Sequence, residues 1–89
     1  MQEREVVIVN KLGLHARAAA KFVALASTFD ATVVIRRGEK QVSGKSIMGV
    51  MMLAAGKGTR LTLCACGTDA ESALEALQEL IDNRFEESE

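Results

Sequence analysis

NKLGLHAR, residues 10–17, carries the chain out of a β-branched run and into an alanine-rich segment. Gly13 has a backbone freedom that other residues lack, so the chain can turn sharply at this point. The residues that follow, ARAAA at 16–20, have high helix propensity. We therefore predict a strand, a tight turn and a helix, with His15, the only histidine in the chain, at the helix start.

The predicted position of His15 suits phosphoryl chemistry. The first backbone N–H groups of a helix have no acceptor within the helix, and the helix dipole adds positive charge there, so a bound anion would be stabilised. A neutral imidazole can attack phosphorus and hold it covalently. Arg17 adds a permanent cation two residues further on. From these residues alone, a solvated loop histidine is the more common interpretation, and it stays open here.

Hydrophobic periodicity predicts alternating strands and helices along the chain. The predicted strands are residues 5–9, 31–36, 41–43 and 60–66; the predicted helices are about a dozen residues after His15, residues 47–53, and a last helix after Gly67. TDAE at 68–71 has the spacing of a capping box for the last helix. EESE at 86–89 is predicted to be a frayed acidic tail.

Two helical stripes are predicted to form the core. The first helix would contribute Ala19, Phe22, Val23, Ala26 and Phe29, and the last helix would contribute Ala73, Leu74, Leu77, Leu80 and Ile81.

Length, charge and composition limit the class of protein. The 89 residues suit one small domain, 1–89. A net charge of −1 and 3% aromatic residues make nucleic acid an unsuitable partner. No apolar run approaches the roughly 20 residues that cross a bilayer, and the first residues do not resemble a signal peptide. We expect a cytoplasmic protein without membrane insertion.

The two cysteines, Cys64 and Cys66, lie two residues apart in a predicted strand. Cysteines this close in one strand rarely form a disulfide, so free thiols are expected. One such pair with a single distant histidine supplies too few ligands for a metal site. We expect neither a metal nor another cofactor.

The second predicted helix has more large apolar residues than one core-facing side can take. Ser46 precedes it and is a good N-cap residue. The helix contains Ile47, Met48, Val50, Met51, Met52 and Leu53, so some of these side chains should stay exposed. Exposed methionines suit an adaptable partner surface, whereas filling of irregular core gaps is an equally supported alternative.

GLHAR at 13–17 and GKSIMGVM at 44–51 resemble the two sequence markers of the HPr family, the phosphocarriers of the bacterial phosphoenolpyruvate phosphotransferase system. The family's spacing between the markers is kept, and the resemblance spans nearly the whole chain. It implies an α+β fold, an open-faced two-layer sandwich. Its four-stranded antiparallel sheet would have the order 1-4-2-3, with three helices on one face.

The resemblance also implies roles for individual residues. His15 would receive the phosphoryl group from enzyme I and pass it to an EIIA-type acceptor, with Arg17 as the arginine of the motif. Ser46 matches the serine that a regulatory kinase, the HPr kinase/phosphorylase, phosphorylates in some bacteria. The protein would be a carrier and not an enzyme. With the two helices side by side, as in the family fold, the apolar surplus of the second helix would form a docking surface of Ile47, Met48 and Met51 together with Ala16 and Ala20 of the first.

One residue departs from the family pattern, and several alternatives to a sugar-transport carrier remain. Sugar-transport carriers usually have proline where this chain has Ala18, which should loosen the loop slightly without removing chemistry. Segments such as MML at 51–53 and NRF at 83–85 resemble the NPr-type carriers, which regulate nitrogen metabolism. A purely regulatory relative would lack His15. An unrelated small α+β ligand-binding module is the alternative from another class.

Overall fold

The computed structural model of the chain describes residues 1–87 and contains the predicted strands and helices in the predicted order. The strands are β1 (Gln2–Val7), β2 (Thr32–Arg37), β3 (Lys40–Ser43) and β4 (Arg60–Cys66). The helices are α1 (Ala16–Ala26), α2 (Ile47–Met52) and α3 (Ala70–Asp82), and a short 3-10 turn, η1 (Arg84–Glu86), follows α3. This is the α+β class that we predicted.

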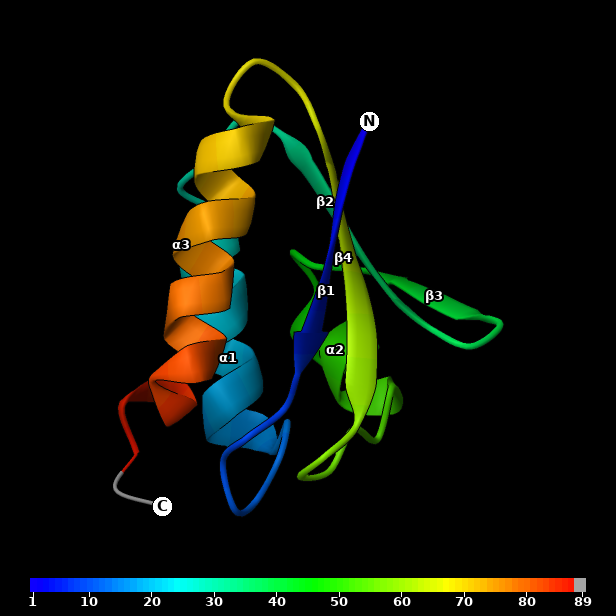
Figure 1. Cartoon of the computed structure of the whole chain (residues 1–89), viewed down its shortest axis with the longest axis vertical. Coiled ribbons are helices and arrows are strands. Elements are labelled where there is room, and N and C mark those ends of the chain that lie inside the picture. The colour runs from blue at the N-terminus through cyan, green and yellow to red at the C-terminus, as the bar shows by residue number, and fades with distance from the viewer. Residues whose placement is uncertain (88–89) are drawn as a thin grey trace.

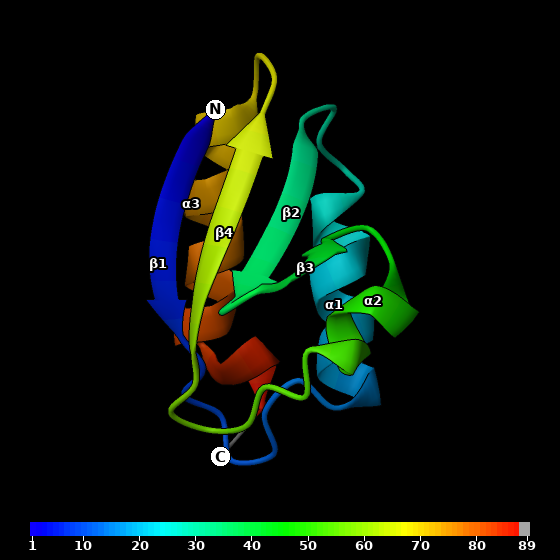
Figure 2. The same cartoon turned by 90° about the vertical axis from the view of Figure 1, so that its right-hand side faces the viewer.

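The strands form one antiparallel sheet with the order β1-β4-β2-β3, which confirms the order implied by the family resemblance. β4 lies between β1 and β2 (Figure 2). Leu61 of β4 is opposite Val6 of β1, and Leu63 is opposite Ile35 of β2. All four of these side chains are buried. β4 is therefore one of the two inner strands of the sheet.

The helices form a second layer. α1 and α3 lie side by side against one face of the sheet, and α2 packs against α1 and β3 (Figure 1, Figure 2). Most of the predicted core stripe is buried: Ala19, Phe22 and Ala26 in α1, and Ala73, Leu74, Leu77 and Ile81 in α3. Val23, Phe29 and Leu80 are only half-buried. Burial of each large apolar side chain contributes about 1.5–3 kcal/mol.

The predicted range 5–9 is wrong for the first strand, because pairing with β4 decides where β1 begins and ends. The polar residue Gln2 pairs with Ala65, and the pairing continues to Val7 opposite Arg60. Beyond Val7, the Ile8 N–H donates to the carbonyl oxygen of Thr59, and the Gly58 N–H donates to the carbonyl oxygen of Ile8. Gly58 and Thr59 precede the first residue of β4, so these bonds lie outside the paired strands. The other predicted strands and the predicted end of α2 agree with the structure to within one residue.

The predicted capping box at the start of α3 is also wrong. Asp69, and not Thr68, is the N-cap residue, and its side chain makes no capping hydrogen bond. Its carboxylate instead accepts hydrogen bonds from the backbone N–H groups of Asp30 and Ala31, both at 2.8 Å. The side chain joins α3 to the segment before β2, a use that local spacing does not indicate.

Cys64 and Cys66 are free thiols, as predicted. Cys64 is buried, with Sγ 3.8 Å from Oε2 of Glu3, whereas Cys66 is exposed. Within residues 1–87, no three potential metal ligands among histidine, cysteine, aspartate and glutamate come together. Over the same range, no helix has the length and hydropathy of a membrane span.

Candidate functional site

The loop between β1 and α1 is organised by the buried side chain of Asn10. Its Nδ2 donates to the carbonyl oxygen of Gly13 at 2.8 Å, and Asn10 itself is fully buried. The Leu14 N–H donates to the carbonyl oxygen of Ala55 at 2.9 Å, which joins the loop to the segment after α2. Leu14 is buried in the core. These contacts fix the backbone immediately before His15.

Gly13 takes the conformation that the sequence predicts for the turn. Its φ is +68°, in the left-handed region that favours glycine. A Cβ at this position would lie 2.4 Å from the carbonyl oxygen of Ala55 and 2.7 Å from Cα of Gly56. The turn therefore needs glycine for both its conformation and the close approach of a second backbone.

His15 is the N-cap residue of α1, as predicted. Its side chain makes no capping hydrogen bond, and its Nε2 lies 2.6 Å from Oε2 of Glu87. The side chain is 27% exposed. Within residues 1–87, Nδ1 has no hydrogen-bond partner. One ring nitrogen is therefore engaged and the other is available for chemistry.

The C-terminal segment does not fray where we predicted. Phe85 is completely buried, and its carbonyl oxygen accepts a hydrogen bond from Nζ of Lys21 at 2.7 Å. Glu87 Oε1 accepts from Asn10 Nδ2 at 3.0 Å. The predicted tail is therefore wrong for residues 86–87, and residues 88–89 lie outside the described part of the chain. An aromatic residue just after the last helix, Phe85, was the signal in the sequence that this segment returns to the core. Figure 1 and Figure 2 show η1 beside the β1–α1 loop.

The pKa of Glu87 is lowered from its ordinary 4.5. The largest cause is the hydrogen bond that Asn10 donates to the carboxylate; the contact with His15 and the charge of Lys21 act in the same direction, against desolvation. Glu87 is therefore ionised at neutral pH.

The start of α1 is open on the side of Arg17. The backbone N–H groups of residues 16–18 have no acceptor within the described residues, and the first helical hydrogen bond runs from the Ala19 N–H to the carbonyl oxygen of His15 at 2.8 Å. Arg17 is exposed and has no hydrogen-bond or ion-pair partner among residues 1–87. Unpaired amides and a nearby guanidinium can stabilise an anion at this helix end.

Ser46 caps α2, as predicted. Its Oγ accepts a hydrogen bond from the Gly49 N–H at 3.1 Å, and the residue is half-buried. One first-turn amide of α2, that of Gly49, is thus satisfied by the N-cap side chain.

The apolar surplus of α2 divides as expected between core and surface. Val50 and Leu53 are fully buried, whereas Met48 is 74% exposed. The other exposed apolar residues of α2 are Ile47, Met51 and Met52. Ala16 and Ala20 are exposed on α1, which packs against α2. Leu12, 67% exposed in the β1–α1 loop, is a further exposed apolar residue that we did not predict.

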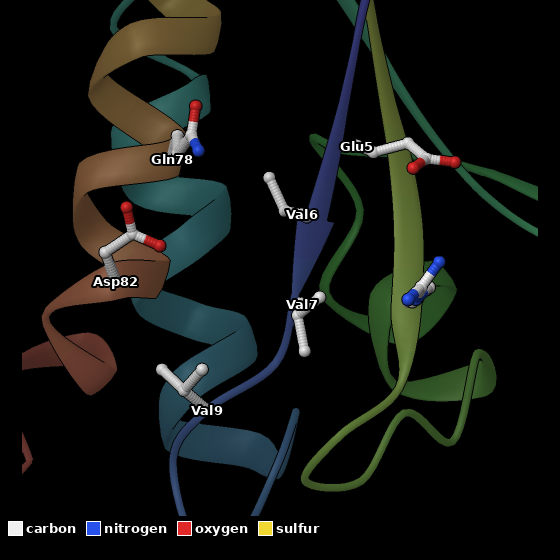
Figure 3. A pocket seen from close by; sticks show the side chains of 7 residues that line it. Glu5, Val6, Val7, Val9, Gln78 and Asp82 are labelled. Atoms are coloured by element: carbon white, nitrogen blue, oxygen red, sulfur yellow. The ribbon is translucent and has the colours of Figure 1, made fainter.

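A surface pocket lies elsewhere, between β1 and α3 (Figure 3). Its lining residues are Glu5, Val6, Val7, Val9, Arg60, Gln78 and Asp82. None of the predicted site residues lines it, and it mixes two acidic side chains with one basic one. It therefore offers no concentrated positive charge to an anionic group.

Both the sequence and the fold resemble known phosphocarrier proteins. Residues 2–83 match the family model PTS-HPr, described as the PTS HPr component phosphorylation site. The chain is 57% identical over 90 residues to a phosphocarrier protein HPr from Pseudomonas putida, with all of both chains covered. It is 51% identical over 86 residues to a phosphocarrier protein NPr from Shewanella violacea, covering 97% of this chain and 94% of that one. Its fold matches the crystal structure of HPr-C-His from Thermoanaerobacter tengcongensis with a TM-score of 0.96 at 44% identity, over 100% of both chains.

Proposed function

Because the chain belongs to the HPr family of phosphocarrier proteins of the bacterial phosphotransferase system, we propose that His15 is the residue that carries the phosphoryl group. The observation that supports this most directly is the partly exposed imidazole at the open start of α1, with one ring nitrogen unpaired within residues 1–87. The protein is a phosphocarrier, as its relatives are named, and not itself an enzyme.

The donor in this proposal is phosphorylated enzyme I, and the acceptor is an EIIA-type protein. Both steps pass a phosphoryl group between His15 and a group on a partner, so negative charge moves across the start of α1. Arg17 would offset that charge through its exposed guanidinium, an electrostatic role that acts in the transition state. A carrier that exchanges phosphoryl groups with these partners would work in the cytoplasm.

The test is phosphorylation by enzyme I and phosphoenolpyruvate, followed by intact mass. The wild type should gain one phosphoryl group, which is lost in mild acid and stable in base, as expected for a phosphoramidate. His15→Ala should gain none. Arg17→Ala should fold normally and accept the group roughly ten- to a thousandfold more slowly. An acid-stable adduct, or an undiminished adduct on His15→Ala, would refute the proposal. Offering the phosphorylated chain to EIIA proteins of the sugar-transport and nitrogen types identifies the acceptor.

We propose that both partners dock on the apolar surface formed by Ala16, Ala20, Ile47, Met48 and Met51. A carrier must fit a donor and an acceptor with one site, and flexible methionines can repack against both. The exposure of Met48 supports docking over the alternative of core filling.

Met48→Glu tests this surface because it adds a charge without touching the imidazole. We expect an unchanged melting temperature and slower transfer from enzyme I. Val7→Glu, at an exposed apolar site on β1, is the matched control and should transfer at the wild-type rate. Clear destabilisation of Met48→Glu, with normal transfer by the folded fraction, would refute docking.

We propose further that Ser46 is a regulatory phosphorylation site for an HPr kinase/phosphorylase. A phosphate there adds about two negative charges beside the docking surface. Ser46→Asp should keep the fold and weaken transfer from enzyme I. Normal transfer by Ser46→Asp would refute this role.

A further inference from the structure

Both carboxylate oxygens of Glu87 make polar contacts beside His15. Oε2 lies 2.6 Å from His15 Nε2, and Oε1 accepts from Asn10 Nδ2 at 3.0 Å. Asn10 is fully buried and also anchors the loop through Gly13. The side chains of His15 and Glu87 are 27% and 18% exposed, so the contact is partly shielded from water.

The three residues before Glu87 adopt a strained backbone conformation. Arg84, Phe85 and Glu86 have φ values of 58°, 54° and 64°, all in the left-handed region although none is glycine. Each such residue costs about 1–2 kcal/mol. The complete burial of Phe85 and the hydrogen bond from Lys21 to its carbonyl oxygen offset this cost. A strained turn that persists at a reactive side chain suggests a functional purpose.

The contact determines which ring nitrogen can react. A neutral imidazole carries one N–H, and an ionised carboxylate can only accept hydrogen bonds. The lowered pKa of Glu87 keeps it ionised, so Nε2 must be the donor in this contact. Nδ1 then holds the lone pair, and it has no hydrogen-bond partner within residues 1–87.

We propose that Glu87 is a positioning residue for phosphoryl transfer: it holds the proton of His15 on Nε2 and thereby presents Nδ1 as the nucleophile. The proposal rests on the proposed function of His15. In the step, the Nδ1 lone pair forms the bond to phosphorus while the bond from phosphorus to the leaving atom of the donor breaks, and the electron pair of that bond leaves with the donor. Nε2 keeps its proton throughout.

The same carboxylate also offsets charge that develops in the reaction. When Nδ1 bonds to phosphorus and Nε2 stays protonated, the ring gains a positive charge. Glu87 lies in contact with the edge of the ring that carries this charge and is already ionised. A carboxylate that orients a histidine and stabilises its cationic form is the arrangement used in serine hydrolase triads. Glu87 thus acts through His15 and touches no reacting atom.

The experiment uses phosphoramidate, a small phosphoryl donor, so that docking of a protein partner cannot influence the result. We would compare Glu87→Ala, Glu87→Gln and the wild type, with Glu86→Ala as the matched control. The Glu86 side chain is 72% exposed and pairs with Lys21 at 3.7 Å, one residue away from the proposed contact. Two quantities are measured: the ¹⁵N signals of the His15 ring, which report the tautomer, and the rate of phosphorylation followed by intact mass.

The neutral ring of the wild type should carry its proton on Nε2, and phosphorus should attach at Nδ1. In Glu87→Ala the ratio of the Nε2–H to the Nδ1–H form should fall, and phosphorylation should slow by about ten- to a hundredfold, the range seen when the hydrogen-bond partner of a metal-ligating histidine is removed. Glu87→Gln keeps an acceptor oxygen without the charge, so it should restore the tautomer but only part of the rate. Glu86→Ala should match the wild type in both.

Unchanged tautomer ratio and rate in Glu87→Ala, phosphorus attached at Nε2, or an equal loss of rate in Glu86→Ala would each overturn the proposal. Any of these results leaves the phosphocarrier function standing if His15 is still the modified residue. Failure of the wild type to be phosphorylated on His15 would instead refute the proposed function itself.

Discussion

The starts of α1 and α2 differ in what their N-cap side chains do. Ser46 bonds to the first turn of its own helix through Gly49, at 3.1 Å. His15 occupies the same position before α1 but bonds to the distant Glu87, and the first amides of α1 have no acceptor within residues 1–87. A helix start that forgoes a stabilising cap departs from local consistency, and such departures concentrate at functional sites.

The two starts also depend on different parts of the chain. The cap of α2 uses residues three apart, whereas the start of α1 needs Gly13 against Ala55 and the tail at Glu87. The α1 site is therefore complete only in the folded molecule, whereas the cap of α2 can form locally. This difference leads to predictions that can be measured as stability.

Gly13→Ala should have the largest effect because it breaks the turn before α1. The new Cβ would meet backbone atoms at 2.4 Å and 2.7 Å and would also strain a φ of +68°. We expect a loss of roughly 2–4 kcal/mol in the free energy of unfolding. Gly38→Ala is the control: its φ is +60°, but no atom lies within 4 Å of the new Cβ, so the loss should be about 1 kcal/mol. Urea unfolding measures both, and equal losses would show that the approach of Ala55 is unimportant.

Ser46→Ala and His15→Ala test whether only α2 relies on its N-cap side chain. Loss of the Ser46 cap should cost about 1 kcal/mol and lower the melting temperature by about 4–8 °C. His15 makes no capping bond, so in a Glu87→Ala background, which already lacks the contact between His15 and Glu87, His15→Ala should change stability by less than about 0.5 kcal/mol. If thermal unfolding gives the two variants the same loss, the proposed contrast between the helix starts is wrong.

Asp69→Asn extends the comparison to the N-cap residue of α3. It should have the smallest effect on the free energy of unfolding, and that effect should depend on pH. The hydrogen bond from the Asp30 N–H, with that from Ala31, holds the pKa of Asp69 below its ordinary 3.8. Because the folded pKa is depressed, this stabilisation is present above pH 3.8 and is lost as the pH falls through the folded value.

The wild type should therefore be more stable than Asp69→Asn at neutral pH, and the difference should shrink in acid. Urea unfolding of both proteins across this range measures it. The acid dependence due to Glu87, whose pKa is also lowered, remains in both proteins and cancels in the difference. A difference that stays constant with pH would contradict the assignment.

Local patterns predicted those parts of the fold that depend on near neighbours. The alternation of residues 60–66 located β4 correctly, and Ser46 was identified as a cap because its partner is three residues away. The capping box at Thr68 failed because Asp69 bonds to Ala31, 38 residues distant, and this competing contact leaves no trace in the local spacing.

The residues of the candidate site likewise fall into those that a local motif predicts and one that only a distant contact reveals. His15, Arg17 and Ser46 are found in short motifs, so the sequence identified them as candidates before the structure placed their side chains. Glu87 was missed because it is 72 residues from His15 and lies in an acidic stretch that resembles a solvated tail. The burial of Phe85, whose place just after the last helix was the sequence signal, shows that this stretch returns to the core.

The sequence by itself determined which segments form strands and helices and that His15 stands at a helix start, because backbone sterics, propensity and periodicity act over a few residues. The tertiary structure decided the strand order β1-β4-β2-β3 and the placement of Glu87 on His15. Both depend on which distant segments bury apolar surface together. β4 is buried between β1 and β2, and Phe85 is buried in the core just before Glu87 in the chain. Burial is a property of the whole packed core, so no short window of sequence contains it.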